Sequence, residues 1–172
     1  AGAELAGLSP NKSYFVRVRA RSRGVETPVA VLVSTLTPAA VPASAASTFT
    51  LVEAGSVTLA WGLGGNPAGT EFLAALSTSM DFTTILDSSW LPAVSSTVYG
   101  LSPNTTYFTA VLARDSALRQ TRELFLGATV TAAAVPQAPA FPSVLTTGLS
   151  VEWSTAGNPG GTRYEAQLSG AA

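Results

Sequence analysis

The chain has 172 residues, of which 47% are hydrophobic and 11% charged, and its formal net charge is −1. This much apolar material fills hydrophobic cores and argues against disorder, and the near-neutral balance excludes the broad positive field that attracts nucleic acid or an anionic membrane. There is no histidine and no cysteine, so the commonest general base, the usual zinc ligands and disulfides are missing. We therefore expect no catalysis and no cofactor.

Strands are predicted along the whole chain, because short apolar-alternating runs are separated by Gly, Pro, Asn and Ser. The first such run spans residues 14–20. In the central part we expect strands at 48–52, 56–61, 71–77, 97–99, 105–114 and 124–131, with a short edge strand near 82–86. The longest apolar runs, at 28–33 and 124–128, fall short of the ~20 residues that a membrane span requires. No membrane insertion is expected.

Three sequence motifs recur at nearly one spacing. The run Gly-Leu-Ser-Pro-Asn occurs at 7–11 and again 93 residues later at 100–104. Trp61 with Gly-Asn-Pro-Ala-Gly-Thr at 65–70 returns 92 residues later as Trp153 with Gly-Asn-Pro-Gly-Gly-Thr, and Val-Pro at 41–42 returns after 94. About seven strands in this period fit a two-sheet Greek-key sandwich of ~100 residues. The sequence thus predicts tandem copies of one all-β domain.

These landmarks resemble the fibronectin type III domain. The resemblance rests on a Trp in the second strand, Trp61 or Trp153, and on the run Leu-x-Pro-x-x-Thr-Tyr that leads into the sixth strand at 101–107. Its earlier copy at 8–14 has Ser in place of Thr. The resemblance implies tandem immunoglobulin-like β-sandwiches, in which Trp61 and Trp153 belong to the core while Tyr14 and Tyr107 are corner tyrosines bonded to upstream backbone. It carries over no functional residue.

The repeats divide the chain into three parts. Residues 1–37 form the C-terminal part of one repeat, 38–132 a complete repeat, and 133–172 the N-terminal part of another. The Pro- and Ala-rich linkers between them favour extended, semi-rigid geometry. The two partial repeats lack strands that would close a sandwich, so either the chain continues in a longer protein or strands of a neighbouring chain complete them. With no initiator Met and no signal-peptide pattern visible, we expect an excerpt of a longer protein. Eight Arg against one Lys, with abundant Ala, indicates a GC-rich bacterial genome.

Two kinds of contact site are predicted. On the outward face of the complete repeat, positions that are charged or polar in the other copies are apolar, and such a patch marks either packing against a neighbouring repeat or chain or cover by loops of the same copy. Its residues are Leu73, Ala75, Phe108, Ala110 and Leu112. Trp90 lies in an irregular segment, where it either packs over the sandwich edge or contacts a carbohydrate or protein ligand.

Two shorter motifs have plain structural interpretations beside functional ones. Asn11 and Asn104 each begin an N-glycosylation acceptor pattern, but Asn also suits the turn at the corner. The Gly-rich run at 64–69 has neither a following helix nor a Lys, so we interpret it as a loop rather than a phosphate cradle. The carboxylates show no spacing typical of acid–base pairs or calcium loops.

The leading functional hypothesis is a non-catalytic structural module of a large extracellular or cell-surface protein that assembles into a fibre or surface layer. A second hypothesis is an adhesion module that binds a protein or carbohydrate through Trp90 and the loops. A third is an accessory spacer in a secreted enzyme. A fold of this kind hosts all three roles.

Overall fold

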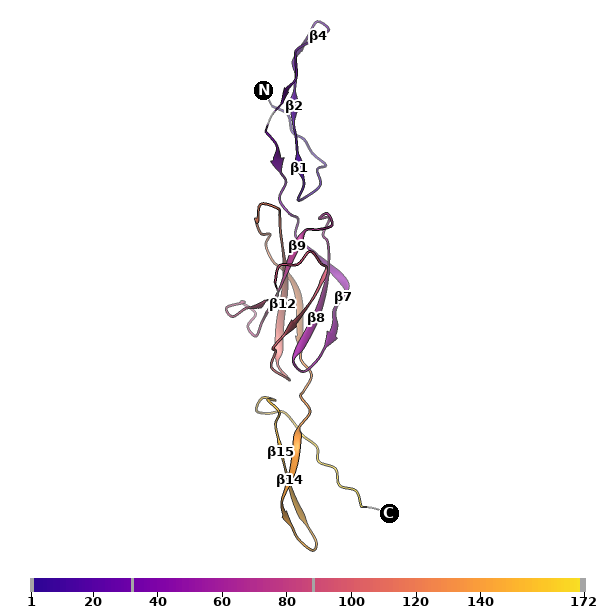
Figure 1. Ribbon diagram of the computed structural model, residues 1–172, viewed down its shortest axis with the longest axis vertical. Helices are drawn as coiled ribbons and strands as arrows, with labels where there is room; N and C mark the ends of the chain where they lie inside the picture. The colour runs from indigo at the N-terminus through magenta and orange to yellow at the C-terminus, as the bar shows by residue number, and fades with distance from the viewer. Residues whose placement is uncertain (1, 32, 88, 171–172) are drawn as a thin grey trace.

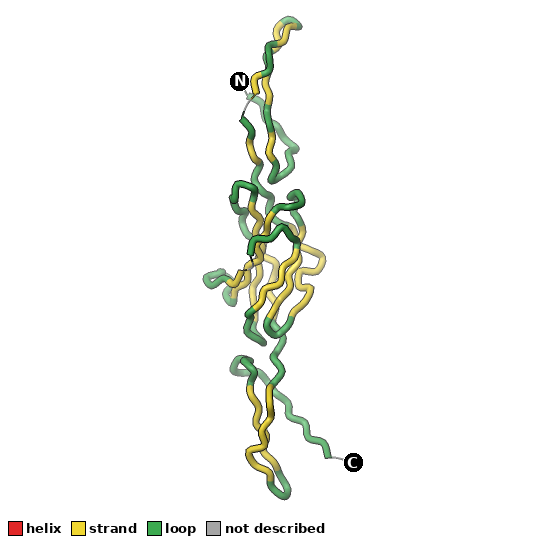
Figure 2. Tube along the Cα trace, in the orientation of Figure 1, coloured by secondary structure: helices red, strands yellow, loops and turns green. Residues whose placement is uncertain are grey.

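The computed structural model describes residues 2–31, 33–87 and 89–170, which form three units in a row along one axis (Figure 1). The described residues contain strands and loops and no helix (Figure 2). In this part of the chain no helix is therefore long and apolar enough to cross a membrane. The prediction of an all-β fold is confirmed.

The middle unit is a sandwich of two antiparallel sheets. One sheet has the order β11-β8-β7, made from β7 (Ala43–Val52), β8 (Ser56–Gly62) and β11 (Ser95–Tyr99). The other has the order β10-β9-β12-β13, made from β9 (Glu71–Ser77), β10 (Leu86–Asp87), β12 (Thr106–Arg114) and β13 (Leu124–Val130). Neighbours that are not consecutive in sequence, such as β9 and β12, give the sandwich its Greek-key connections.

The hydrophobic core lies between these sheets, where strict alternation sends every second side chain inward. Trp61 and Phe72 face each other from the two sheets with ring centroids 6.1 Å apart and planes tilted by 54°. The buried core cluster consists of Val57, Leu59, Trp61, Phe72, Ala74, Leu76, Val98, Leu101, Tyr107, Val111 and Ala113. The sequence has no cysteine, so no disulfide contributes to the stability of this core.

Thr109 is the one polar side chain among the inward positions of β12 between Tyr107 and Ala113. It is buried, and its hydroxyl donates a hydrogen bond of 2.9 Å to the carbonyl oxygen of Gly127. The β12–β13 register shifts between Thr109 and Ala110, which marks a bulge, and Gly127 opposite it has a φ of 116° that suits glycine. The bulge thus supplies the acceptor that a buried hydroxyl needs.

The predicted edge strand near 82–86 is displaced, because β10 covers only Leu86–Asp87. Residues 79–82 form a turn instead. Phe82 has a φ of 52°, its amide donates to the carbonyl of Ser79, and the carboxylate of Asp81 accepts from the Ser79 hydroxyl and the Thr83 amide. A left-handed residue cannot continue a strand, so pairing begins only after this turn.

The first unit is a long two-stranded ladder broken into three short pieces. β1 (Ser13–Tyr14) pairs with β6 (Thr35–Leu36), β2 (Arg17–Val18) with β5 (Ala30–Val31), and β3 (Arg21–Ser22) with β4 (Val25–Glu26). In the third unit, β14 (Gln137–Val144) pairs with β15 (Leu149–Ser154). The register of that hairpin shifts across Pro139 and Pro142, because proline cannot donate to a ladder.

Candidate functional site at the repeat junctions

The corner that ends each upstream unit has the same geometry at both junctions. The hydroxyl of Tyr14 accepts a 2.7 Å hydrogen bond from the amide of Ser9, and the hydroxyl of Tyr107 accepts a 2.9 Å bond from the amide of Ser102. Three residues before each tyrosine lies an asparagine with left-handed backbone, at φ 48° and 46°. Asparagine tolerates this conformation better than most residues, so the corner directs its side chain outward at a fixed angle.

These corner asparagines reach across to the next unit. The Nδ2 of Asn11 donates to the Oγ1 of Thr70 at 2.9 Å, and the Nδ2 of Asn104 donates to the Oγ1 of Thr162 at 3.0 Å. Both threonines end the recurring Gly-Asn-Pro-x-Gly-Thr run. An N-linked glycan would modify the same amide nitrogens, so it would compete with the junction contact at either site.

A second asparagine clamps each linker from the downstream side. Asn66 is buried; its Oδ1 accepts from the amide of Ala40 and its Nδ2 donates to the carbonyl of Ala40, both at 2.8 Å. Asn158 is also buried and makes the same two bonds, again at 2.8 Å, to Ala134. The side-chain amide thereby pairs with both backbone groups of one linker residue, as a neighbouring strand would.

The linkers are held from the upstream side as well. The amide of Asn11 donates to the carbonyl of Pro38 at 3.0 Å, and the amide of Asn104 donates to the carbonyl of Ala132 at 3.1 Å. A single residue therefore lies between the upstream and the downstream anchor of each linker, Ala39 in the first and Ala133 in the second. Such a short free segment leaves little room for bending between units.

The asparagine clamps are ordered by turns in their own loops. Asn66 and Asn158 each donate a further bond to a carbonyl three residues back, to Leu63 at 2.7 Å and to Thr155 at 2.8 Å. The two loops differ at Gly64. A Cβ added there would lie 2.1 Å from the carbonyl oxygen of Val41 in the linker, whereas the equivalent position in the third unit is already Ala156. The linker passes closer to the loop at the first junction.

The first junction has additional contacts from the loop between β12 and β13. The amide of Ser116 donates to the Oδ1 of Asn11 at 3.0 Å, and the guanidinium of Arg119 donates to the carbonyl of Leu36 at 3.1 Å. Arg119 is held by Asp115, whose buried carboxylate lies 2.7 Å from its Nε. These contacts bind the downstream unit to both the corner and the last strand of the upstream unit.

The pKa of Asp115 reflects this role. Burial acts to raise the pKa, but hydrogen bonds from the backbone and side chain of Arg119 and from the amide of Ala117, with the arginine charge, outweigh it and hold the pKa below its ordinary value. The carboxylate is therefore ionised at neutral pH and keeps the loop in the conformation that reaches the upstream unit.

Trp90 is half-buried and lies near the beginning of β9. The Arg114 guanidinium lies 4.5 Å from the centroid of its ring, and the Nε of Arg114 is 2.6 Å from the Oε2 of Glu71. The adjacent Leu91 forms an isolated bridge with Phe72. One ring face is thus covered by an arginine that an ion pair holds in place, which leaves less of the ring for a ligand.

The predicted apolar face lies on β9 and β12, where Leu73 is opposite Leu112 and Ala75 is opposite Ala110. The two alanines are buried, while Leu73, Phe108 and Leu112 are half-buried. The small central side chains are therefore not exposed to solvent, and the face offers less apolar surface than alternation alone indicates.

The junction residues were not among the site residues that the sequence predicts. Their motifs are visible in the sequence, but the pattern alone indicates turn residues at Asn11 and Asn104 and a loop at the Gly-rich run. The signal that points to them is the co-recurrence of the Asn and Thr positions at both junctions. Within the described residues, no group of three or more Asp or Glu side chains is placed to hold a metal ion.

No protein-family model matches the sequence, and a search of curated proteins also gives no match. Among solved structures, a two-domain fibronectin type III segment from chicken tenascin is 12% identical with a TM-score of 0.52, and the match covers 69% of this chain and 65% of that one. The fibronectin type III domain of human fibronectin type III domain containing protein 3 is 17% identical with a TM-score of 0.45, covering 57% of this chain and 90% of that one.

Proposed function

We propose, given that the chain has a fibronectin type III-like fold, that it is a non-catalytic structural segment of a large extracellular or cell-surface protein whose successive repeats are locked into a stiff row. The observation that carries the proposal is the junction built twice from the same residue types. A fold typical of extracellular and adhesion proteins supports the location.

The repeated clamp supports a mechanical role. A flexible string of domains needs linkers with free residues, whereas each linker here is bonded on both sides of a single alanine. Repeat proteins in which each unit contacts only its neighbours derive their length and stiffness from such interfaces. Because one clamp geometry recurs, every further copy with the same motifs would extend the row in the same direction.

Assembly into a fibre or surface layer is the finer part of the proposal. The half-buried residues Leu73, Phe108 and Leu112 are the surface through which rows would pack side by side. Leu112→Asp tests this: an interface residue loses association while the middle unit keeps its melting temperature, whereas a residue covered within the unit loses stability.

Binding of a protein or carbohydrate ligand is the alternative. The feature that favours it is Trp90, because its ring is held rigidly by Arg114 at the sandwich edge. In that case the native protein shows saturable binding that Trp90→Ala abolishes, with Tyr99→Ala, which removes an exposed aromatic side chain elsewhere on the middle unit, as the control.

Electron microscopy of the native protein tests the proposed function directly. Straight rods, or ordered fibres or sheets built from them, are the expected result. Flexible strings whose units bend freely at every linker would refute a structural role for the junctions, and the search would move to ligands of Trp90 and the loops.

A further inference from the structure

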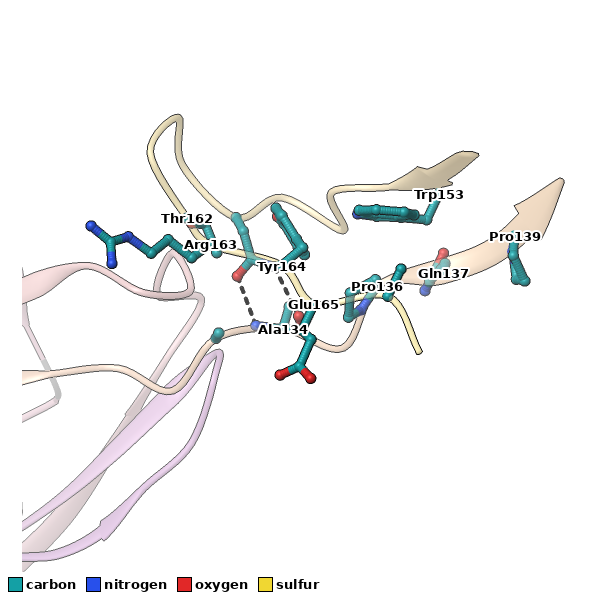
Figure 3. Close-up of a pocket in the computed structure, with 12 residues that line it drawn as sticks. Ala134, Pro136, Gln137, Pro139, Trp153, Thr162, Arg163, Tyr164 and Glu165 are labelled. Carbon is teal, nitrogen blue, oxygen red and sulfur yellow. Dashed lines mark hydrogen bonds between the residues drawn. The ribbon is translucent and has the colours of Figure 1, made fainter. Parts of the chain in front are cut away.

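A cavity of about 460 Å³ in the third unit contains core side chains rather than a ligand site (Figure 3). Trp153 and Tyr164 line it, at the positions that Trp61 and Phe72 occupy in the middle unit. Their ring centroids lie 5.8 Å apart with planes tilted by 55°, close to the 6.1 Å and 54° of the Trp61–Phe72 pair. The cavity therefore belongs to the core of its own repeat, and the feature that points to a ligand is the distribution of charge.

Positive charge is concentrated in one short stretch of the first unit. Five of the nine Lys and Arg residues of the chain lie within residues 12–23. Four of these five are Arg17, Arg19, Arg21 and Arg23. Residues 13–36, which form the two-stranded ladder, contain a single acid, Glu26. The net charge of −1 for the whole chain thus conceals a strongly basic segment.

The arginine stripe, defined as Arg17, Arg19 and Arg21, lies on one face of this ladder. The three residues are exposed and occupy alternate positions of one strand, so their side chains point to the same side. The opposite side carries Val18, which is equivalent to the core residue Val111 of the middle unit. The arginine stripe therefore faces away from the core of its repeat, whichever residues complete that core.

Glu26 lies on the same face as the arginine stripe. It is the strand partner of Arg21, and its Oε2 lies 2.5 Å from the Nη1 of Arg19. The side chains of Arg19 and Glu26 are 57% and 36% exposed, so solvent screens this ion pair. One carboxylate shared by two guanidinium groups leaves the stripe with an excess of positive charge, for which a ligand with several anionic groups can compete.

Apolar side chains border the arginine stripe. Val31 lies opposite Arg17 in the ladder, and Phe15 precedes Arg17 by two residues, which places both on the arginine face. Val31 is 68% exposed and Phe15 is 74% exposed. Such side chains can pack on the apolar C–H faces of sugar rings, while guanidinium groups form paired hydrogen bonds with carboxylate or sulfate. The face thus offers both kinds of contact that an acidic sugar needs.

The arginine stripe runs along the long axis of the row, because β1, β2 and β4 follow one another in that direction (Figure 1). Alternate residues of a strand are roughly 6.6 Å apart, so the three arginines span roughly 13 Å. Charge spread along a line suits a linear polymer better than a single small anion. A single-stranded nucleic acid fits less well, since its bases stack on successive aromatic side chains, and the other aromatic residue of the first unit, Tyr14, lies on the opposite face.

We propose that the first unit binds a linear acidic polysaccharide along the arginine stripe. The guanidinium groups pair with its anionic groups, and Phe15 and Val31 pack on its sugar rings. The middle unit has Ala110 and Leu112 at the positions of Arg17 and Arg19, so its equivalent face does not share this chemistry. The proposal depends neither on the stiffness of the junctions nor on assembly into fibres.

Titration of the 172-residue chain with fluorescently labelled polygalacturonate and dextran sulfate tests the proposal, with uncharged dextran as the reference polymer. We expect saturable binding of the acidic polymers, which weakens steeply between about 50 and 200 mM salt, and no binding of dextran. Arg17→Ser should weaken binding by about 10-fold, because it removes one charged contact. The matched control is Arg122→Ser, which removes an exposed arginine of the middle unit and should bind like the unmodified chain.

Glu26→Gln has the opposite expected sign. It removes the carboxylate that competes for Arg19 and Arg21, so it should tighten binding by about 3-fold, a result that damage to the fold would not produce. Absence of binding to both acidic polymers, equal effects of Arg17→Ser and Arg122→Ser, or weaker binding by Glu26→Gln would each overturn the proposal. Tighter binding of single-stranded DNA than of either polysaccharide would also overturn it, in favour of a nucleic-acid ligand. None of these outcomes bears on the stiffness of the junctions.

Discussion

Replacing Asn66 by alanine is the sharpest perturbation of the first junction. The side chain makes three hydrogen bonds, two to Ala40 in the linker and one to Leu63 in its own loop. At about 1 kcal/mol net for each bond, the substitution costs roughly 3 kcal/mol, of which about 2 kcal/mol concerns the linker. That is about a 30-fold increase in the population of an opened junction. The sandwich itself should stay folded, because the residue lies outside its core cluster.

Distances between paired spin labels measure this opening, and the absence of cysteine from the chain allows labels to be placed at will. Cysteines at the exposed positions Ser34 and Ser95 span the first junction, and cysteines at Ala128 and Ser150 span the second. Asn66→Ala should broaden the distance distribution of the first pair only, and Asn158→Ala that of the second only. If Asn66→Ala leaves the first distribution as narrow as before, the clamp does not fix the junction; if both distributions broaden, the effect is not local.

Three further outcomes follow from the same geometry. The folded-state pKa of Asp115 lies below its unfolded value, so its contribution to the first junction is complete above about pH 4 and is lost as pH falls through the folded pKa. The distance distribution of the first label pair should therefore broaden on acidification, and an unchanged distribution would contradict this role of the carboxylate. Tyr107→Phe removes the bond to the corner and should destabilise the middle unit by about 1–2 kcal/mol in denaturant, while Tyr14→Phe leaves its midpoint unchanged, and equal effects would contradict the assignment. Gly64→Ala puts a Cβ 2.1 Å from a carbonyl oxygen of the linker, so it should displace the linker and broaden the first distribution as much as loss of the clamp does.

The fold could be predicted from the sequence because its determinants are local. Alternation placed β8, β9 and β12 within a residue or so of their observed bounds, and the Tyr and Trp landmarks indicated the sandwich. The edge strand was displaced because the left-handed Phe82, a residue type that rarely adopts this backbone, extends a turn that no pattern marks. The recurring motifs indicate that the chain contains copies of one domain, but the alternation of apolar and polar residues carries no information on how one copy packs against the next.

The junction was missed for that reason. Its bonds join residues 26, 59 and 105 positions apart, and the last two join different units and so depend on both being folded first. The first unit shows the same limitation of local sequence patterns. Residues 14–20 have the alternation of β12, yet they form only two-residue pieces. They pair on one side only, with the short pieces β5 and β6, and alternation alone does not report which partner a strand has.

The clamp recurs at both junctions, whereas the loop that adds contacts at the first junction differs in length between the first and the middle unit, and this divides stiffness into a constant and a variable part. The clamp is constant because Asn66 and Asn158 bond both their own turn and the linker, so the loop and the junction order together. The variable part is the loop after β12, which at residues 115–119 reaches back to the upstream unit. Its equivalent in the first unit is the tight turn between β3 and β4, at Arg23 and Gly24, which is too short to supply such a contact. A longer or shorter loop at this position of a repeat would therefore change the stiffness of the junction that the loop contacts, while the asparagine clamp would keep the direction of the row unchanged.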